Sequence, residues 1–192
     1  FFLLAVFILP LCFNIDFILS LWLKEIPAYT NIFVILFLAN VLAESYSTYL
    51  ITVLLATGKI AFYQASVGTI LLLNVPLSYL AFQWGYPPVS FLVVSIILTF
   101  AASALRLFLL KKRFSFSITL FLRSVFLKTL LTILLVSALN FMLLNLRSLL
   151  PYGNILVLLF SCLISMGGIY ILGLNSEERR IVIVQAKKYL HR

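Results

Sequence analysis

The segment VSFLVVSIILTFAASALRLFLL, residues 89–110, carries one charged side chain, Arg106, in an otherwise apolar and weakly polar run. As a helix it would rise about 33 Å, enough to cross a hydrocarbon core of about 30 Å. Lipid offers backbone N–H and C=O groups no hydrogen-bond partner, so a lipid-embedded segment of this kind must be helical. The segment therefore predicts a transmembrane helix.

Five further apolar stretches fill most of the remaining chain. They lie at residues 1–13, 29–56, 60–84, 129–146 and 154–174. With 64% hydrophobic and 10% charged residues, and a mean hydropathy of +1.20, the composition excludes an ordinary soluble domain. We predict an all-α polytopic transmembrane bundle over residues 1–174, followed by a tail at 175–192. Because Phe1 lies within an apolar run, we read the first span as truncated and expect the chain to be the C-terminal portion of a larger protein.

The basic residues indicate how the spans are oriented. If the helices alternate, one side of the membrane receives two of the fourteen Lys and Arg residues and the other receives eleven, with Arg106 inside a span. The positive-inside rule makes the richer side, and the C-terminus, cytoplasmic. Aromatic residues that favour the headgroup level gather at the opposite boundary: Trp22, Tyr29, Trp84, Tyr86 and Tyr152. This distribution suits a membrane rather than a nucleic acid partner.

Two segments outside the spans are amphipathic. As a helix, residues 114–128 would have one apolar and one polar face. The tail at 175–192 would have one apolar and one basic face. Both patterns are typical of helices lying in the membrane surface. The tail is expected to bind anionic lipid headgroups, so membrane lipids are predicted partners.

Two ionisable groups lie inside the spans, where each costs several kcal/mol unless it faces protein or water. The first is Glu44, which belongs to a polar stripe of Asn40, Glu44, Ser47, Thr48 and Thr52. The second is Arg106, the last residue of a stripe of Ser95, Thr99, Ser103 and Arg106. These stripes could line a substrate or ion path, with Glu44 as a proton or cation site and Arg106 as an anion contact. Alternatively, Glu44 is hydrogen-bonded between helices, and Arg106 extends to the headgroups.

A proline divides the 60–84 span. Asn74, a further candidate residue of the substrate or ion path, lies two residues before Pro76 near the middle of the span. Proline removes one backbone hydrogen bond and kinks a helix. The kink is either a hinge of the kind transporters use or an ordinary feature of a membrane helix.

Motifs for enzyme chemistry do not occur in the sequence. There is no Gly-rich phosphate loop, no metal-ligand spacing and no Cys/His or Ser/His pairing, and the single histidine is His191 in the tail. We therefore predict neither catalytic residues nor a cofactor or metal, and read Cys12 and Cys162 as packing residues. The pattern favours passive or ion-coupled transport.

Four strings of sequence, in this order, resemble a known family. They are Leu21-Trp22-Leu23-Lys24-Glu25-Ile26-Pro27, Ala56-Thr57-Gly58-Lys59 leading into Tyr63-Gln64, Asn74-Val75-Pro76-Leu77-Ser78-Tyr79, and Gly85-Tyr86-Pro87-Pro88. Together they resemble, over about residues 9–113, the C-terminal half of bacterial O-antigen and capsular polysaccharide flippases of the multidrug/oligosaccharidyl-lipid/polysaccharide exporter superfamily. Lys24 stands where that family often has Gly.

The resemblance implies one lobe of a two-lobe exporter that moves a polyprenyl-pyrophosphate-linked oligosaccharide across the bacterial inner membrane by alternating access. Implied partners are the lipid-linked oligosaccharide, an N-terminal lobe of the same protein and a polysaccharide polymerase. Family members carry charged residues in the cavity, and Arg106 and Glu44 are the residues here that could fill such positions. Two alternatives stay open: a cation-coupled drug antiporter of the same superfamily, and a polytopic membrane glycosyltransferase or polymerase, which the short outer loops disfavour.

Overall fold

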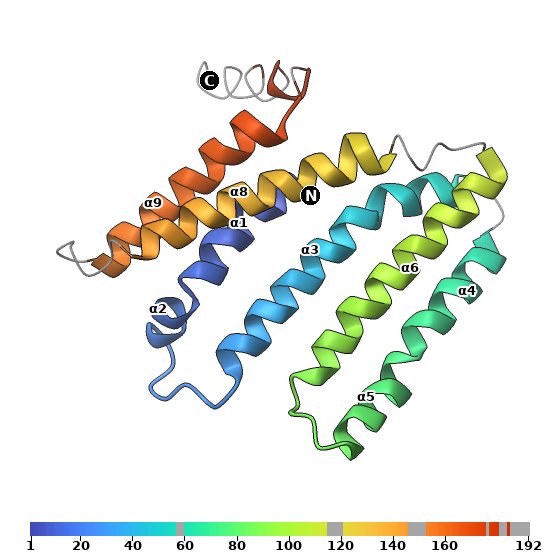
Figure 1. Ribbon diagram of the computed structural model, residues 1–192, viewed down its shortest axis with the longest axis horizontal. Helices are drawn as coiled ribbons and strands as arrows, with labels where there is room; N and C mark the ends of the chain where they lie inside the picture. Colours follow the sequence, from blue (N-terminus) through green and yellow to red (C-terminus); the bar gives the residue numbers. More distant parts are fainter. Residues whose placement is uncertain (57–59, 115–120, 146–152, 176, 181–183, 185–192) are drawn as a thin grey trace. The chain divides into compact units, whose positions relative to one another are not determined.

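The computed structural model describes the chain except at residues 57–59, 115–120, 146–152, 176, 181–183 and 185–192. The described residues form two compact units. The first contains Phe1 and residues 15–121, and the second contains residues 2–14 and 122–192. Every regular element in the described part is helical (Figure 1).

Five helical segments among the described residues are long and apolar enough to cross a membrane. They are Thr30–Leu55, Tyr63–Gln83, Ser90–Lys112, Leu127–Leu144 and Gly153–Gly173. Each falls on a stretch for which the sequence predicts a span, and the remaining stretch forms the shorter apolar helix Phe2–Phe13. The prediction of an all-α, multi-pass membrane protein is confirmed.

The helices of the first unit pack around the last of them. Its helices are α2 (Ile15–Ser20), α3 (Thr30–Leu55), α4 (Ile60–Leu72), α5 (Asn74–Gln83) and α6 (Ser90–Phe114). Helix α6 packs most extensively against α3 and also contacts α4 and α5 (Figure 1). Side chains from α3, α4 and α6, together with Phe121, form the apolar core of this unit: Leu50, Leu54, Tyr63, Val67, Ala102, Leu109, Leu110 and Phe121.

The predicted break in the 60–84 span lies at Leu73, between α4 and α5. Pro76 has no N–H to donate, so the carbonyl of Leu72 loses its partner four residues on. The regular pattern resumes one residue later, where the Leu77 N–H donates to the Leu73 carbonyl at 3.1 Å. The proline thus divides one span into two helical segments.

A tight turn joins α5 to α6. Gly85 has a φ of +81°, and its N–H donates to the Phe82 carbonyl at 3.0 Å. A backbone of this handedness strains residues with a Cβ, so glycine suits the position. The turn reverses the chain in the few residues that the sequence leaves between the two spans.

The second unit consists of α1 (Phe2–Phe13), α8 (Leu127–Leu144) and α9 (Gly153–Gly168), with π-helical turns at Leu122–Phe126 and Ile169–Gly173. Helix α9 packs against both α8 and α1. Helix α9 comes close to α8 at Gly168, where an added Cβ would lie 2.8 Å from Cγ2 of Val136. A glycine is therefore needed for α8 and α9 to pack as they do.

Of the two predicted surface helices, the structure describes only parts. Within 114–128, the π-helical turn Leu122–Phe126 runs directly into α8, whose first two residues, Leu127 and Lys128, complete the segment. Residues 115–120 and most of the tail at 175–192 lie outside the described residues. The surface location of both segments stays a prediction.

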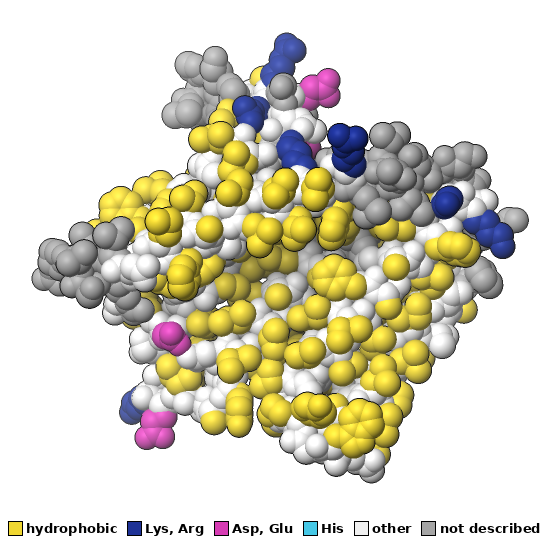
Figure 2. Space-filling model, in the orientation of Figure 1, with side chains coloured by type: hydrophobic (Ala, Val, Ile, Leu, Met, Phe, Trp, Pro, Cys, Tyr) yellow, Lys and Arg dark blue, Asp and Glu magenta, His cyan; other side chains and the backbone are white. Residues whose placement is uncertain are grey.

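Apolar side chains dominate the face of the molecule drawn in Figure 2, and charged side chains gather toward its edges. Large apolar residues of the spans are exposed, among them Phe37, Ile97 and Phe108. In water such a surface would drive aggregation, whereas in a bilayer it contacts lipid chains. The exposed surface therefore agrees with the length of the helices in pointing to a membrane.

Candidate functional site

Two clusters of polar side chains link α3 to α6 inside the first unit. In the first cluster, the Asn40 amide donates from Nδ2 to Oγ of Ser95 at 3.3 Å and accepts from Oγ1 of Thr99 at 3.0 Å. Both ends of the amide are therefore used across the helix interface. A pairing of this kind fixes the register of two membrane helices, because an unpaired amide in lipid is unfavourable.

The second cluster is built around Arg106, which is only 5% exposed. Its Nη1 donates to Oγ of Ser47 on α3 at 2.7 Å, and its Nε donates to the hydroxyl of Tyr63 on α4 at 3.2 Å. One side chain thus joins α3, α4 and α6. Arg106 is therefore held by partners within its unit.

The partners of Arg106 are neutral. Ser47 in turn donates to the backbone carbonyl of Glu44 at 3.1 Å, so its hydroxyl is fully oriented. In the described part of the chain no carboxylate lies within ion-pair distance of the Arg106 guanidinium. A guanidinium stays protonated in proteins, so this interface keeps an uncompensated positive charge.

Ser103 lies between the two clusters on α6. Its hydroxyl donates to the backbone carbonyl of Thr99 at 2.8 Å. The two clusters and this hydroxyl form a continuous strip that we call the polar seam. It comprises Asn40, Ser47, Tyr63, Ser95, Thr99, Ser103 and Arg106.

Glu44 lies outside the polar seam, although the sequence places it on the same stripe of α3. Its side chain is exposed. The carboxyl group makes no hydrogen bond or ion pair to any residue that the structure describes. Within its unit, Glu44 therefore does not form the hydrogen bond between helices that was one alternative from the sequence. Glu44 therefore lies in the middle of the α3 span with its carboxyl group unpaired among the described residues.

Asn74 and Pro76 also lie apart from the polar seam. The Asn74 side chain accepts a hydrogen bond from Oγ of Ser78 at 3.1 Å, one turn further along α5. Pro76 is exposed beside the break between α4 and α5. Of the residues proposed from the sequence, the structure therefore brings together Asn40, Ser95, Thr99, Ser103 and Arg106, and leaves Glu44, Asn74 and Pro76 outside.

A third polar cluster, in the second unit, was not predicted as one. Asn140 of α8 donates from Nδ2 to Oγ of Ser165 at 3.1 Å and to the carbonyl of Val136 at 2.8 Å, and it accepts a short hydrogen bond from Ser161. All of these side chains are buried. Because every group is neutral and paired, the cluster serves to hold α8 against α9.

The chemistry available at the polar seam is limited to binding and positioning. The seam contains hydroxyls, one amide and one guanidinium, with no histidine, cysteine or carboxylate side chain as a base. Among the described residues no group of three or more His, Cys, Asp and Glu could hold a metal ion.

No protein-family model, no curated protein sequence and no solved structure matches this chain.

Proposed function

We propose that the chain is the C-terminal portion of a bacterial inner-membrane flippase, which moves polyprenyl-pyrophosphate-linked oligosaccharide from the cytoplasmic to the periplasmic leaflet. The observation that carries the proposal is the buried, uncompensated guanidinium of Arg106 in the polar seam. A charge at membrane depth costs about 2.5–3.5 kcal/mol on insertion scales, which a purely structural contact could avoid with a neutral side chain.

The placement of Arg106 supports an alternating-access mechanism. Because it is 5% exposed, a substrate phosphate could reach it only after α3 or α4 moves away from α6. The planar guanidinium could then exchange Ser47 and Tyr63 for phosphate oxygens, which it holds better than hydroxyls. Closure of the polar seam would expel the phosphate, as alternating access requires. The break beside Pro76 offers α4 and α5 a place to bend.

The test uses the complete protein in a bacterial strain from which the gene has been deleted. Deletion should remove the surface glycan and leave its lipid-linked precursor in the cytoplasmic leaflet. Arg106→Lys keeps the charge but loses the planar fork, so glycan display should fall about tenfold or more at normal membrane protein level. Lys112→Gln, which removes an exposed cation from the same helix, is the matched control and should export normally.

Two results would count against this function. Normal glycan display in the deletion strain would refute the flippase outright. Arg106 would be only a structural link between helices if two results were found together. These are full activity of Arg106→Lys, and a loss of activity in Arg106→Gln that low protein level explains.

The free carboxyl group of Glu44 favours one second candidate, a cation-coupled drug antiporter. A carboxyl group within a span, without a hydrogen-bond or ion-pair partner among the described residues, is open to bind a proton or a cation. Under this alternative, Glu44→Gln abolishes drug resistance conferred by the protein while glycan display is unaffected. Under the flippase proposal with ion coupling, the same variant impairs glycan display.

A further inference from the structure

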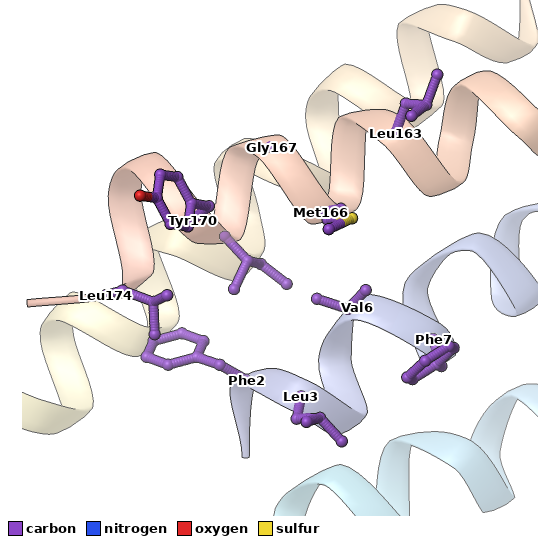
Figure 3. A pocket seen from close by; sticks show the side chains of 10 residues that line it. Phe2, Leu3, Val6, Phe7, Leu163, Met166, Gly167, Tyr170 and Leu174 are labelled. Atoms are coloured by element: carbon purple, nitrogen blue, oxygen red, sulfur yellow. The ribbon is translucent and has the colours of Figure 1, made fainter. Parts of the chain in front are cut away.

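An apolar groove runs between α1 and α9 in the second unit. It encloses about 700 Å³ (Figure 3). Phe2 and Phe7 of α1 line one wall, and Leu163, Met166 and Gly167 of α9 line the other. The volume lies in the range of about 300–1,000 Å³ typical of sites for molecules with a few tens of heavy atoms, so a fatty acyl chain can be accommodated.

A cationic side chain lies beside one end of the groove. Tyr170 closes that end, and the guanidinium carbon of Arg179 lies 5.8 Å from the centre of its ring. The Arg179 side chain donates from Nη2 to the carbonyl of Ile171, while its buried Nε has no partner in the described part of the chain. A guanidinium has five N–H donors, so most of the donors of Arg179 are unused.

A second cation and an acidic group lie near the same end. Lys128 donates from Nζ to Oδ1 of Asn175, and Glu178 accepts from the backbone N–H of Asn175 at 2.7 Å. Glu178 therefore has a partner other than Arg179, and the described residues contain no ion pair to Arg179. Among the described residues, therefore, no carboxylate compensates the charge of Arg179.

We propose that this groove binds one acyl chain of an anionic membrane phospholipid, with the lipid phosphate held by Arg179 at the Tyr170 end. The apolar side chains that line the groove favour an apolar chain. The unused guanidinium donors favour the phosphate of an anionic lipid over that of a zwitterionic choline lipid, which carries no net charge. This site does not depend on the flippase proposal, because it requires only a membrane.

Gly167 allows the groove to be filled without disturbing the fold. A Cβ added there would meet no atom within 4 Å. Gly167→Leu should therefore project into the groove and exclude an acyl chain, whereas Gly167→Ala should leave room for it. Gly68 of α4 is the matched control, since its Cβ would also meet no atom within 4 Å and it belongs to the other unit.

The measurement is native mass spectrometry of the purified complete protein, supplemented with phosphatidylglycerol or phosphatidylcholine of identical acyl chains. The wild type should retain phosphatidylglycerol with about fivefold preference, as expected for one cation near the membrane surface. Arg179→Gln should lower that preference to about one, while Lys112→Gln should not. Gly167→Leu should lose both lipids, and Gly68→Leu and Gly167→Ala should match the wild type.

Several outcomes would overturn the inference. Equal retention of both lipids by the wild type would remove the role of Arg179, and an equal effect of Lys112→Gln would indicate general attraction to an anionic surface. Unchanged retention by Gly167→Leu would exclude the groove. Retention of added polyprenyl phosphate in place of phosphatidylglycerol would assign the groove to a transport substrate, and a wild type that holds no lipid would mean that protein fills it.

Discussion

Replacing Gly168 with alanine should disrupt the packing of α8 on α9. The added Cβ would lie 2.8 Å from Cγ2 of Val136, about 0.7 Å inside the shortest favourable separation of two carbon atoms, about 3.5 Å. Val136 is fully buried and β-branched, with one strongly preferred side-chain rotamer in a helix, so it cannot turn aside. Overpacking of this kind costs about 1–3 kcal/mol of stability.

Alanine also stabilises a helix relative to glycine, by about 1 kcal/mol. In a single variant this gain would obscure the cost of the clash. The neighbouring Gly167 removes the ambiguity, because a Cβ there meets no atom within 4 Å. Gly167→Ala receives the helix gain without the clash. The two variants should therefore differ by about 1–3 kcal/mol, with Gly168→Ala the less stable. Combining Gly168→Ala with Val136→Ala should recover part of the difference.

Thermal unfolding of the purified complete protein in detergent measures this difference. The Tm of Gly168→Ala should lie below that of Gly167→Ala, by roughly 2–4 °C per kcal/mol for a cooperative unit of 150–250 residues. Equal Tm values for the two variants would refute the close approach of Gly168 to Val136. A double variant less stable than the sum of its two parts would refute it as well.

Two further predictions address the second unit and the topology. Asn140→Leu should lower stability by about 1–2 kcal/mol in the same assay, because the buried hydroxyls of Ser161 and Ser165 lose their partner, and an unchanged Tm would contradict the hydrogen-bond cluster. With both native cysteines replaced, a cysteine at Tyr86 should react with an impermeant thiol reagent from outside the cell and one at Lys111 should not; reversed labelling would overturn the orientation.

The sequence predicts the spans well because their signal is local. The stretch 29–56 becomes Thr30–Leu55, and the break at Leu73 follows from a proline three residues later. Both features depend on length, apolar content and backbone hydrogen bonding, which neighbouring residues determine. The stripes of polar residues on α3 and α6 are predicted for the same reason, since helical spacing decides which residues share a face.

The partners of each polar residue are not predicted in this way. Arg106 bonds to Ser47 and Tyr63, which are 59 and 43 positions away, and nothing in the sequence around Tyr63 marks it as a partner. Asn140 carried a usable signal: a lone amide in an apolar span needs a hydrogen-bond partner, and Ser161 and Ser165 lie one turn apart on the next span. The predicted polar stripes do not include Asn140, so the cluster was missed.

The polar seam of the first unit and the Asn140 cluster of the second unit differ in what they can do. The Asn140 cluster is neutral and fully paired, so opening it would leave amide and hydroxyl groups unpaired with no compensating ligand. The polar seam contains a permanent charge held by two hydroxyls, a weaker arrangement than a guanidinium with phosphate or carboxylate. An anionic ligand can therefore offset the cost of opening the polar seam, and nothing equivalent applies to the Asn140 cluster. Movement coupled to substrate is thus expected at α3–α6, while α8 and α9 stay together.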